Sequence, residues 1–171
     1  MDLKNITVLG SGIMGHGIAQ VSATAGYIVV LRDIEQGFLD KAMEKIKWSL
    51  DKLVSKGKIS QEEANSIYSR ITPIVDLAES VKNAQLVIEV VPEIMELKKK
   101  VYAELDAVAG KDVIFASNTS TLPITEIANT TSRPEKFIGI HFFNPPQLMK
   151  LVEVIPGEKT AQEIVDLTQE Y

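Results

Sequence analysis

Residues 6–17 read Ile-Thr-Val-Leu-Gly-Ser-Gly-Ile-Met-Gly-His-Gly, and this stretch decides the fold. Its apolar start, residues 6–9, predicts a short strand, and the glycines that follow predict a tight turn. Small residues over about 13–25 then favour a helix that ends before Gly26, and residues 27–31 predict a second strand. The order of strand, turn, helix and strand is that of a βαβ unit.

Gly10, Gly12 and Gly15 have the GxGxxG spacing at the point where the strand gives way to the helix. In such a loop the first glycine permits a tight turn, the second lets the backbone approach a pyrophosphate, and the third lets helix and strand pack closely. The amides and the positive end of the helix dipole would then face the phosphates. Glycine turns also serve packing alone in many α/β proteins, so the motif depends on its context.

The rest of the chain alternates helical and strand-like patterns. A long amphipathic helix is expected over about 38–54, a short helix from the capping-box spacing at Ser60 and Glu63 through about Ser69, and further helices over 94–109 and from about 160. Strands are expected at 71–75, 86–91, 113–116, 137–142 and 151–155, and only the last two could be antiparallel. We therefore predict an α/β, Rossmann-type, doubly wound and mostly parallel sheet that forms one domain over residues 1–171.

The composition argues against several classes of function. With 171 residues, 45% of them hydrophobic, the chain can bury one core, and its net charge of −5 gives no electrostatic footprint for nucleic acid or an anionic membrane. The absence of cysteine excludes disulfides and thiolate metal sites, and we expect no metal. No apolar stretch approaches the roughly 20 residues that span a bilayer. These features predict a cytoplasmic protein without a nucleic-acid or membrane partner.

Asp33 follows the second predicted strand at the spacing expected after a glycine loop. An acidic side chain there can accept hydrogen bonds from both hydroxyls of an adenine ribose and would repel a 2′-phosphate, which favours NAD over NADP. The alternative is that Asp33 caps the helix that begins near residue 36.

The two histidines differ in their surroundings. His16 lies inside the first predicted helix and is expected to fill space or to bond locally, whereas His141 ends an apolar strand. Such strand ends are where open α/β sheets bind ligands, although a buried structural histidine is the alternative. Glu153, alone among apolar neighbours, faces either solvent on an edge strand or a buried partner. If that partner were His141, the carboxylate would fix the tautomer of the imidazole.

Further along the chain, residues 116–121 read Ala-Ser-Asn-Thr-Ser-Thr directly after a predicted strand. One of these polar side chains is expected to face a ligand, or the cluster caps the next helix. Together with the glycine loop, this stretch, Gly-Ile-His-Phe-Phe-Asn-Pro at 139–145 and Met-Lys-Leu-Val-Glu-Val at 149–154 resemble successive signatures of the L-3-hydroxyacyl-CoA dehydrogenases. The resemblance runs from about residue 5 to the end of the chain, and the order of its motifs makes it specific.

This resemblance implies NAD-dependent oxidation of (S)-3-hydroxyacyl-CoA to 3-oxoacyl-CoA, a reaction of fatty-acid β-oxidation. It makes His141 the general base, Glu153 the residue that orients it, and Ser120 a hydrogen-bond partner of the reacting oxygen. The implied cofactor contacts are Gly10, Gly12, Ile13, Met14, Gly15, Asp33, Glu93, Lys98, Asn118 and Ser120. Lys98 belongs to a run of three lysines, so a solvated helix surface is its alternative interpretation.

Ser49 and Lys56 match positions that touch the CoA moiety in the family, although ordinary solvated side chains explain them equally well. Complete members continue into a helical C-terminal domain that does not fit in this chain, so we expect a truncated protein that is weakly active or inactive alone. The apolar surface left for that domain could favour a homo-oligomer. The competing hypotheses are an NAD-dependent dehydrogenase of a small hydroxy acid and a non-catalytic NAD-binding module.

Overall fold

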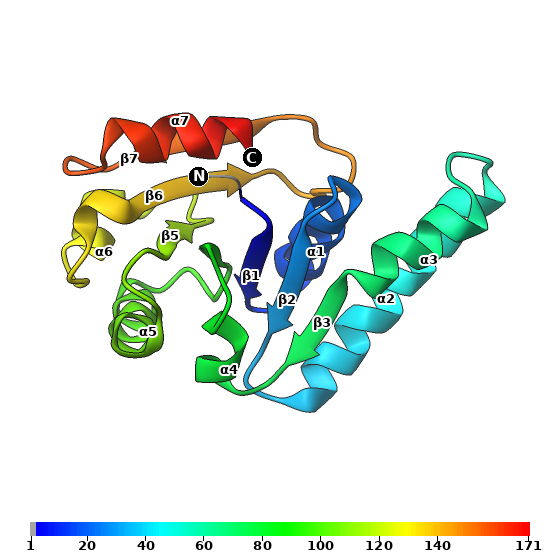
Figure 1. Ribbon diagram of the computed structural model, residues 1–171, viewed down its shortest axis with the longest axis horizontal. Helices are drawn as coiled ribbons and strands as arrows, with labels where there is room; N and C mark the ends of the chain where they lie inside the picture. The colour runs from blue at the N-terminus through cyan, green and yellow to red at the C-terminus, as the bar shows by residue number, and fades with distance from the viewer. Residues whose placement is uncertain (1–2) are drawn as a thin grey trace.

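The computed structural model describes residues 3–171, which form a seven-stranded sheet in the order β3-β2-β1-β4-β5-β6-β7 (Figure 1). The strands are β1 (Asn5–Leu9), β2 (Ile28–Arg32), β3 (Ile71–Ile74), β4 (Leu86–Glu89), β5 (Ile114–Ser117), β6 (Phe137–Phe142) and β7 (Val152–Pro156). Neighbours among the first six strands pair in parallel, and β7 is antiparallel to β6. The predicted fold class is confirmed, including the antiparallel last strand.

Helices cover both faces of this sheet (Figure 1). They are α1 (Ile13–Thr24), α2 (Gln36–Ser55), α3 (Gln61–Ser69), α4 (Leu77–Val81), α5 (Met95–Val108), α6 (Ile124–Ala128) and α7 (Gln162–Glu170), with a 3₁₀ turn at Pro134–Lys136. Successive strand residues point to opposite faces, so Phe115 joins the core under α4, α5 and α6 while Ala116 joins the core under α1, α2, α3 and α7. Because both faces are covered, β4 and β5 are buried throughout and lack polar alternation.

The order of the strands places a crevice beside β1. Strands β2 and β3 lie on one side of β1, and strands β4 to β7 lie on the other side. The connections that follow β1 and β4 therefore leave on opposite faces of the sheet. In open α/β sheets, ligands bind in the crevice outside the carboxyl ends of the strands at such a switch point. The glycine loop directly follows β1 and therefore lies at this point.

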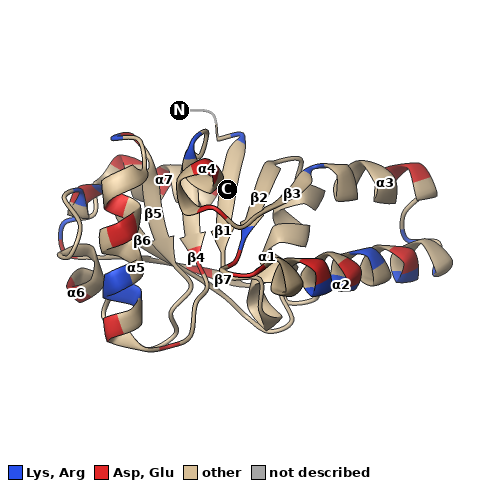
Figure 2. Ribbon diagram, turned by 90° about the horizontal axis from the view of Figure 1, so that it is seen from below, with Lys and Arg blue, Asp and Glu red and all other residues tan. Residues whose placement is uncertain are grey.

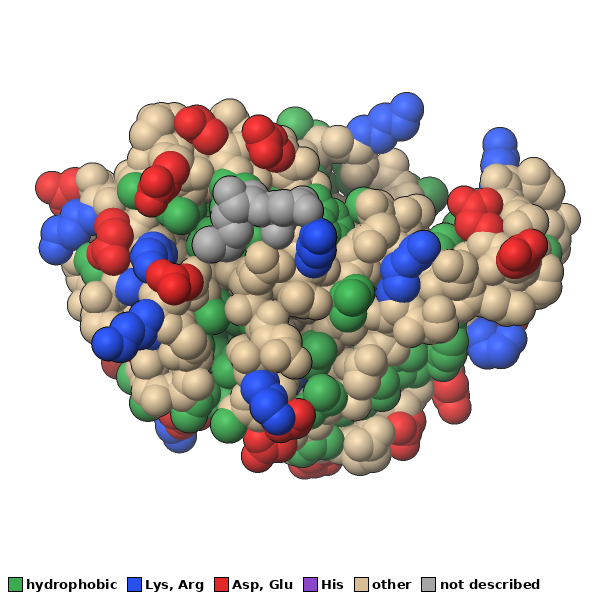
Figure 3. Space-filling view, viewed as in Figure 1, with side chains coloured by type: hydrophobic (Ala, Val, Ile, Leu, Met, Phe, Trp, Pro, Cys, Tyr) green, Lys and Arg blue, Asp and Glu red, His purple; other side chains and the backbone are tan. Residues whose placement is uncertain are grey.

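Helices α2 and α3 form an arm that extends beyond the sheet (Figures 1 and 2). The start of α3 is capped as predicted, since the backbone N–H of Glu63 donates to the Ser60 hydroxyl at 3.0 Å. Basic and acidic residues are interspersed along α2 in Figure 2 and over the face of the molecule seen in Figure 3. Within residues 3–171, no helix is both long enough and apolar enough to cross a membrane.

Strand β4 ends two residues earlier than the predicted strand at 86–91. The backbone N–H of Val90 still bonds to the Leu9 carbonyl at 2.7 Å, but that of Val91 donates to the side chain of Glu89 at 2.7 Å. The Glu89 carboxylate thus replaces the neighbouring strand as the hydrogen-bond acceptor of the Val91 N–H, and the chain turns away from the sheet there. Apolar character alone could not predict this end.

Tyr102 connects α5 to β5 through a buried hydrogen bond. Its hydroxyl donates to the Ala116 carbonyl at 2.8 Å, its ring packs against Phe115 and Phe137, and burial raises its pKa well above the usual value. Tyr102→Phe removes this buried hydrogen bond, so we expect the free energy of unfolding to fall by about 1 kcal/mol. Urea titration would measure it. The control is Tyr68→Phe in α3, and equal losses in both variants would contradict the assignment.

Candidate functional site

The three glycines of the loop meet different surroundings. Gly10 has φ +102°, and a Cβ atom there would lie 2.7 Å from the Val90 carbonyl oxygen. A Cβ atom on Gly15 would lie 1.7 Å from the Gly10 carbonyl oxygen, whereas one on Gly12 would have no atom within 4 Å. Gly10 and Gly15 are therefore required by the backbone and by helix packing. The space at Gly12 is left open for something outside the chain.

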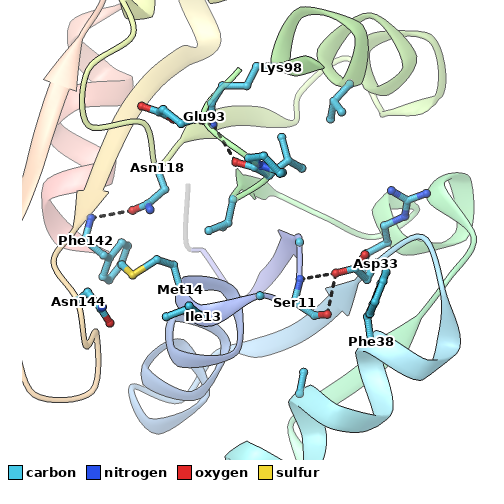
Figure 4. Close-up of a pocket in the computed structure, with 18 of the residues that line it drawn as sticks. Ser11, Ile13, Met14, Asp33, Phe38, Glu93, Lys98, Asn118, Phe142 and Asn144 are labelled. Carbon is cyan, nitrogen blue, oxygen red and sulfur yellow. Dashed lines mark hydrogen bonds and ion pairs between the residues drawn. The ribbon is translucent and has the colours of Figure 1, made fainter. Parts of the chain in front are cut away.

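A pocket of about 920 Å³ lies at the carboxyl edge of the sheet, in front of Gly12 (Figure 4). Most of the predicted site residues line it, namely Gly10, Gly12, Ile13, Met14, Asp33, Glu93, Lys98, Asn118, Ser120 and His141. Figure 4 places Ser11 and Asp33 on one side of the pocket and Glu93, Lys98 and Asn118 on the other. The first turn of α1, which contains no acidic residue, faces the space between them. Backbone amides at a helix start favour an anion there.

Asp33 is held at the end of β2 by the glycine loop. One carboxylate oxygen accepts hydrogen bonds from the backbone N–H and the hydroxyl of Ser11, both at 2.7 Å, and the other accepts from the N–H of Ile34. The alternative interpretation of Asp33 as a helix cap is wrong, because α2 has Glu35 at its N-cap. Asp33 instead presents a half-buried carboxylate to the pocket.

His141 and Glu153 are direct partners across the antiparallel pair β6 and β7. Directly opposite side chains lie on the same face of a sheet, and here Nδ1 of His141 is 2.8 Å from Oε2 of Glu153. The ring also lies against Phe143, with 4.5 Å between the ring centroids. Two alternatives were considered for Glu153, namely exposure on an edge strand and pairing with a partner. Both hold in part, because its side chain is half exposed on an edge strand and is also paired with His141. Because Nδ1 is engaged, the other ring nitrogen is the one available to a ligand.

His16 bonds locally, as expected. Its Nδ1 atom lies 2.6 Å from the Gly12 carbonyl oxygen. Burial lowers the pKa of the ring, and the contact with Gly12 opposes that shift. His16 therefore belongs to the support of the glycine loop.

Lys98 is buried, so its interpretation as solvated helix surface is wrong. Its side chain is 1% exposed, and its ammonium lies 2.7 Å from Oε1 of Glu89 and 3.3 Å from Oε2 of Glu93. Burial raises the pKa of Glu89, against the opposing effect of Lys98. Burial also acts to raise the pKa of Glu93, but hydrogen bonds from Thr119 and the charge of Lys98 outweigh it and lower that pKa.

The polar side chains at the end of β5 and just after it fall into two groups, one that supports the site from beneath and one that lines the pocket. The hydroxyl of Ser117 donates to Glu89 at 2.7 Å and that of Thr119 donates to Glu93, and both residues are buried. Asn118 and Ser120 alternate with them and line the pocket. The amide oxygen of Asn118 accepts a hydrogen bond from the N–H of Phe142 at 2.8 Å, which ties the end of β5 to the end of β6. Two members of the cluster, rather than one, face the pocket.

Comparison with known proteins matches residues 5–171 to the family described as 3-hydroxyacyl-CoA dehydrogenase, NAD binding domain. The chain belongs to this family. Its sequence is 46% identical over 170 residues to a fatty acid oxidation complex subunit alpha from Idiomarina loihiensis, and 44% identical over 161 residues to a 3-hydroxybutyryl-CoA dehydrogenase from Clostridioides difficile. A solved structure of 3-hydroxybutyryl-CoA dehydrogenase from Escherichia coli K12 superposes with a TM-score of 0.96 at 39% identity. The predicted family and the predicted cofactor, NAD, are thus confirmed.

These similarities cover nearly all of the chain but only part of each relative. The matches span 99% and 94% of the chain and 24% and 57% of the two relatives, and the structural match spans 99% and 36%. The chain therefore corresponds to the NAD-binding part of longer 3-hydroxyacyl-CoA dehydrogenases. The pocket fits that cofactor, because it combines open space at Gly12, amides at the start of α1 and a carboxylate at Asp33.

Four predicted residues lie outside the lining of this pocket, and one of them, Glu153, is the partner of the pocket-lining His141. Gly15 packs beneath the loop, whereas Ser49 in α2 and Lys56 directly after it lie further along the arm. Ser49 follows the pocket-lining Lys45 by four residues and precedes Lys56 by seven, so the three share one side of the helix. A ligand that left the pocket along α2 would meet Ser49 and then Lys56.

Sequence reasoning missed Glu89 and Thr119, which support the site from beneath. Glu89 is 0% exposed and contacts both Lys98 and Ser117. A signal was present, since Glu89 is the single charge in an otherwise apolar strand and precedes Lys98 by nine residues. A buried charge needs a partner, and only the packing of α5 against β4 identifies which lysine provides it.

Gly12 and Gly15 give a matched pair of variants. Gly15→Ala forces a Cβ atom against backbone and should lower the free energy of unfolding by about 1–3 kcal/mol. Gly12→Ala should lower it by no more than about 1 kcal/mol, yet weaken NAD binding by roughly tenfold or more, because the methyl group enters the space next to the pyrophosphate. Thermal unfolding and calorimetric titration measure the two effects. Unchanged NAD affinity in Gly12→Ala would refute this role.

Proposed function

We propose that this chain supplies the NAD site and the His141–Glu153 pair of an enzyme that oxidises (S)-3-hydroxyacyl-CoA to 3-oxoacyl-CoA. The observation that carries the proposal is that His141, paired with Glu153 at 2.8 Å, lines the same pocket as the glycine loop and Asp33. A base and a nucleotide site therefore share one space. The relatives named as dehydrogenases of hydroxyacyl-CoA and hydroxybutyryl-CoA support the substrate class.

In this mechanism the free ring nitrogen of His141 takes the proton of the 3-hydroxyl group. Bound NAD would supply the acceptor for the hydride that leaves C3, the carbon that carries this hydroxyl. Glu153 holds the ring in the tautomer whose free nitrogen can accept a proton, and its negative charge stabilises the imidazolium that forms. The hydroxyl of Ser120 hydrogen-bonds the reacting oxygen. General base catalysis of this kind contributes roughly 10²- to 10⁴-fold.

The cofactor would be held by groups along the floor and both sides of the pocket. Asp33 would bind the adenine ribose, and the amides around Gly12, Ile13 and Met14 would bind the pyrophosphate. Glu93, Lys98, Asn118 and Ser120, which line the same pocket as His141, would hold the nicotinamide half.

The CoA part of the substrate would lie along the arm, against Ser49 and Lys56. A hydroxyl and an ammonium suit phosphate oxygens. The lysines that α2 turns toward the pocket, Lys41 and Lys45, add positive charge next to the proposed path.

Self-association of the chain and its cytoplasmic location stay predictions from the sequence.

The first test is NADH formation by the 171-residue chain with (S)-3-hydroxybutyryl-CoA and NAD, combined with calorimetric NAD binding. We expect binding with slow turnover, because Ser120 and Glu153 are exposed and water has access to the reacting groups. His141→Ala should reduce the remaining turnover by roughly 10²-fold or more while the NAD affinity stays within about threefold. Lys100→Ala, at an exposed position of α5 outside the pocket lining, is the control. Full activity of His141→Ala would overturn the mechanism.

Lys56→Ala tests the CoA path separately. Because the side chain is exposed, its contact with a phosphate is screened by water and salt, and we expect the affinity for CoA to fall only about two- to fivefold. The loss should shrink at high ionic strength, and NAD affinity should not change. Lys58→Ala, two residues further on, serves as control. Equal effects of Lys56→Ala and Lys58→Ala would remove Lys56 from the site.

A further inference from the structure

Trp48 is the single tryptophan of the chain, and it lies in the open on the arm, in α2. The residue is 64% exposed. The ammonium of Lys52, one turn further along the helix, lies 4.7 Å from the centre of the ring. A cation is attracted to the face of an indole, so Lys52 is held beside the ring. The greater part of the ring still faces water and is free to contact a ligand.

The residues around Trp48 on the helix surface are all charged. Side chains three and four positions away are the neighbours of a helical residue, and for Trp48 these are Glu44, Lys45, Asp51 and Lys52. A surface that docks another protein groups apolar side chains in a contiguous patch, and none of these four neighbours is apolar. A lone aromatic ring among charges instead suits a planar base that carries phosphates.

The charges beside Trp48 are sorted by sign. Successive residues are about 100° apart around a helix, so Lys45 and Lys52 lie on one flank of the ring and Glu44 and Asp51 lie on the other. An anion next to the ring would be attracted to the basic flank and repelled by the acidic one. The phosphates of a bound nucleotide therefore have one preferred side.

The basic flank is the outer part of a row of lysines that starts in the pocket. Steps of four, seven and four residues keep the members of this row on one side of α2, namely Lys41, Lys45, Lys52 and Lys56. The first two line the pocket, and Figure 4 shows Phe38, from the first turn of the same helix, beside Asp33. The row runs roughly 16 Å from Lys45 to Lys56. A ligand that left the pocket along it would pass Trp48.

We propose that Trp48 is the platform on which the adenine base of the CoA substrate stacks, with Lys52 beside it to hold a phosphate of the same nucleotide. The inference rests on the proposed function and deepens it, since that function places CoA on the arm but assigns nothing to its base. CoA ends in an adenosine that carries a 3′-phosphate and a 5′-diphosphate. An aromatic ring stacks on a base through its face, and an ammonium is a suitable partner of phosphate.

Intrinsic fluorescence tests the contact directly, because Trp48 is the single source of tryptophan emission in the chain. Adenosine 3′,5′-bisphosphate and CoA, each titrated without NAD, should quench this emission until it saturates. Phosphopantetheine lacks the base and should leave the emission unchanged. NAD should also leave it unchanged, because its adenine is expected at Asp33. Saturating CoA binding by calorimetry without quenching, or an equal response to NAD, would overturn the proposal.

Substitutions of Trp48 measure what the ring contributes. By calorimetry, Trp48→Ala should weaken CoA binding about five- to tenfold, and Trp48→Phe, which keeps a smaller ring, about two- to threefold. The affinities for phosphopantetheine and NAD should not change, and thermal unfolding should be that of the parent because the residue is exposed. Lys47→Ala, on the side of α2 away from the lysine row, is the control. Equal losses for CoA and phosphopantetheine in Trp48→Ala would refute stacking.

A competing occupant of the exposed ring is a second copy of the chain. In that case the emission of the chain without ligand would shift to shorter wavelength as the protein concentration rises, and Trp48→Ala would dissociate the oligomer. We expect the emission to be independent of protein concentration. A concentration-dependent shift that Trp48→Ala abolishes would show that the ring belongs to an interface, and would refute the nucleotide platform.

Steady-state kinetics separates this inference from the proposed function. With (S)-3-hydroxybutyryl-CoA, Trp48→Ala should raise KM about five- to tenfold while kcat stays within about twofold, as expected for binding energy that does not change in the reaction. With the pantetheine thioester of the same acid, parent and variant should behave alike. An unchanged KM for the CoA substrate would refute the platform and leave the role of His141 intact. Quenching by adenosine 3′,5′-bisphosphate without turnover of either thioester would retain the platform and refute the proposed reaction.

Discussion

Helix α1 can start directly above the end of β1 only because Gly15 has no side chain. A Cβ atom at that position would lie 1.7 Å from the Gly10 carbonyl oxygen, which is far inside any allowed contact. The close approach turns the floor of the pocket into backbone, with amides at the surface. The N–H of Gly10 in turn donates to the carbonyl of Arg32 at 2.8 Å, which aligns the end of β1 with the end of β2. Asp33, the next residue, is thereby brought within reach of Ser11.

The antiparallel pairing of β7 has a comparable effect on the other side of the pocket. An antiparallel partner needs only a short connection, whereas a parallel one needs a crossover of a dozen or more residues. The nine residues between β6 and β7 therefore stay near the carboxyl edge of the sheet, where Phe143 and Asn144 line the pocket. The same pairing sets Glu153 opposite His141. One change of strand direction thus adds part of the pocket lining and supplies the partner of the histidine.

Much of this arrangement could be predicted from local pattern. The glycine spacing, the alternation of helices with strands and the position of Asp33 specify the fold and one half of the site, because each depends on neighbours in the sequence. Lys98 could not be placed in this way. In a run of three lysines, only the packing of α5 decides which side chain turns inward, and the structure buries Lys98 while leaving Lys100 exposed. The polar cluster after β5 was ambiguous for the same reason, since strand-like alternation buries Ser117 and Thr119 and leaves Asn118 and Ser120 toward the pocket.

Stability alone does not explain why the charged side chains of Glu89 and Lys98 are buried beneath the loop that carries Ser120. Replacing a buried ion pair by apolar side chains of similar volume is often neutral or stabilising, because the desolvation of the two charges offsets much of their attraction. An apolar core beneath the Ser120 loop would therefore support the fold equally well. It could not present a carboxylate that accepts from Thr119, Ser120 and Thr121 at once and also borders the pocket. The hydrogen bond from Thr119 and the Lys98 ammonium behind Glu93 together lower the pKa of that carboxylate, and the buried ammonium must itself be balanced. Glu89 provides that balance from the interior of the sheet, so the charge of a strand residue with no access to solvent determines the geometry at the surface of the pocket.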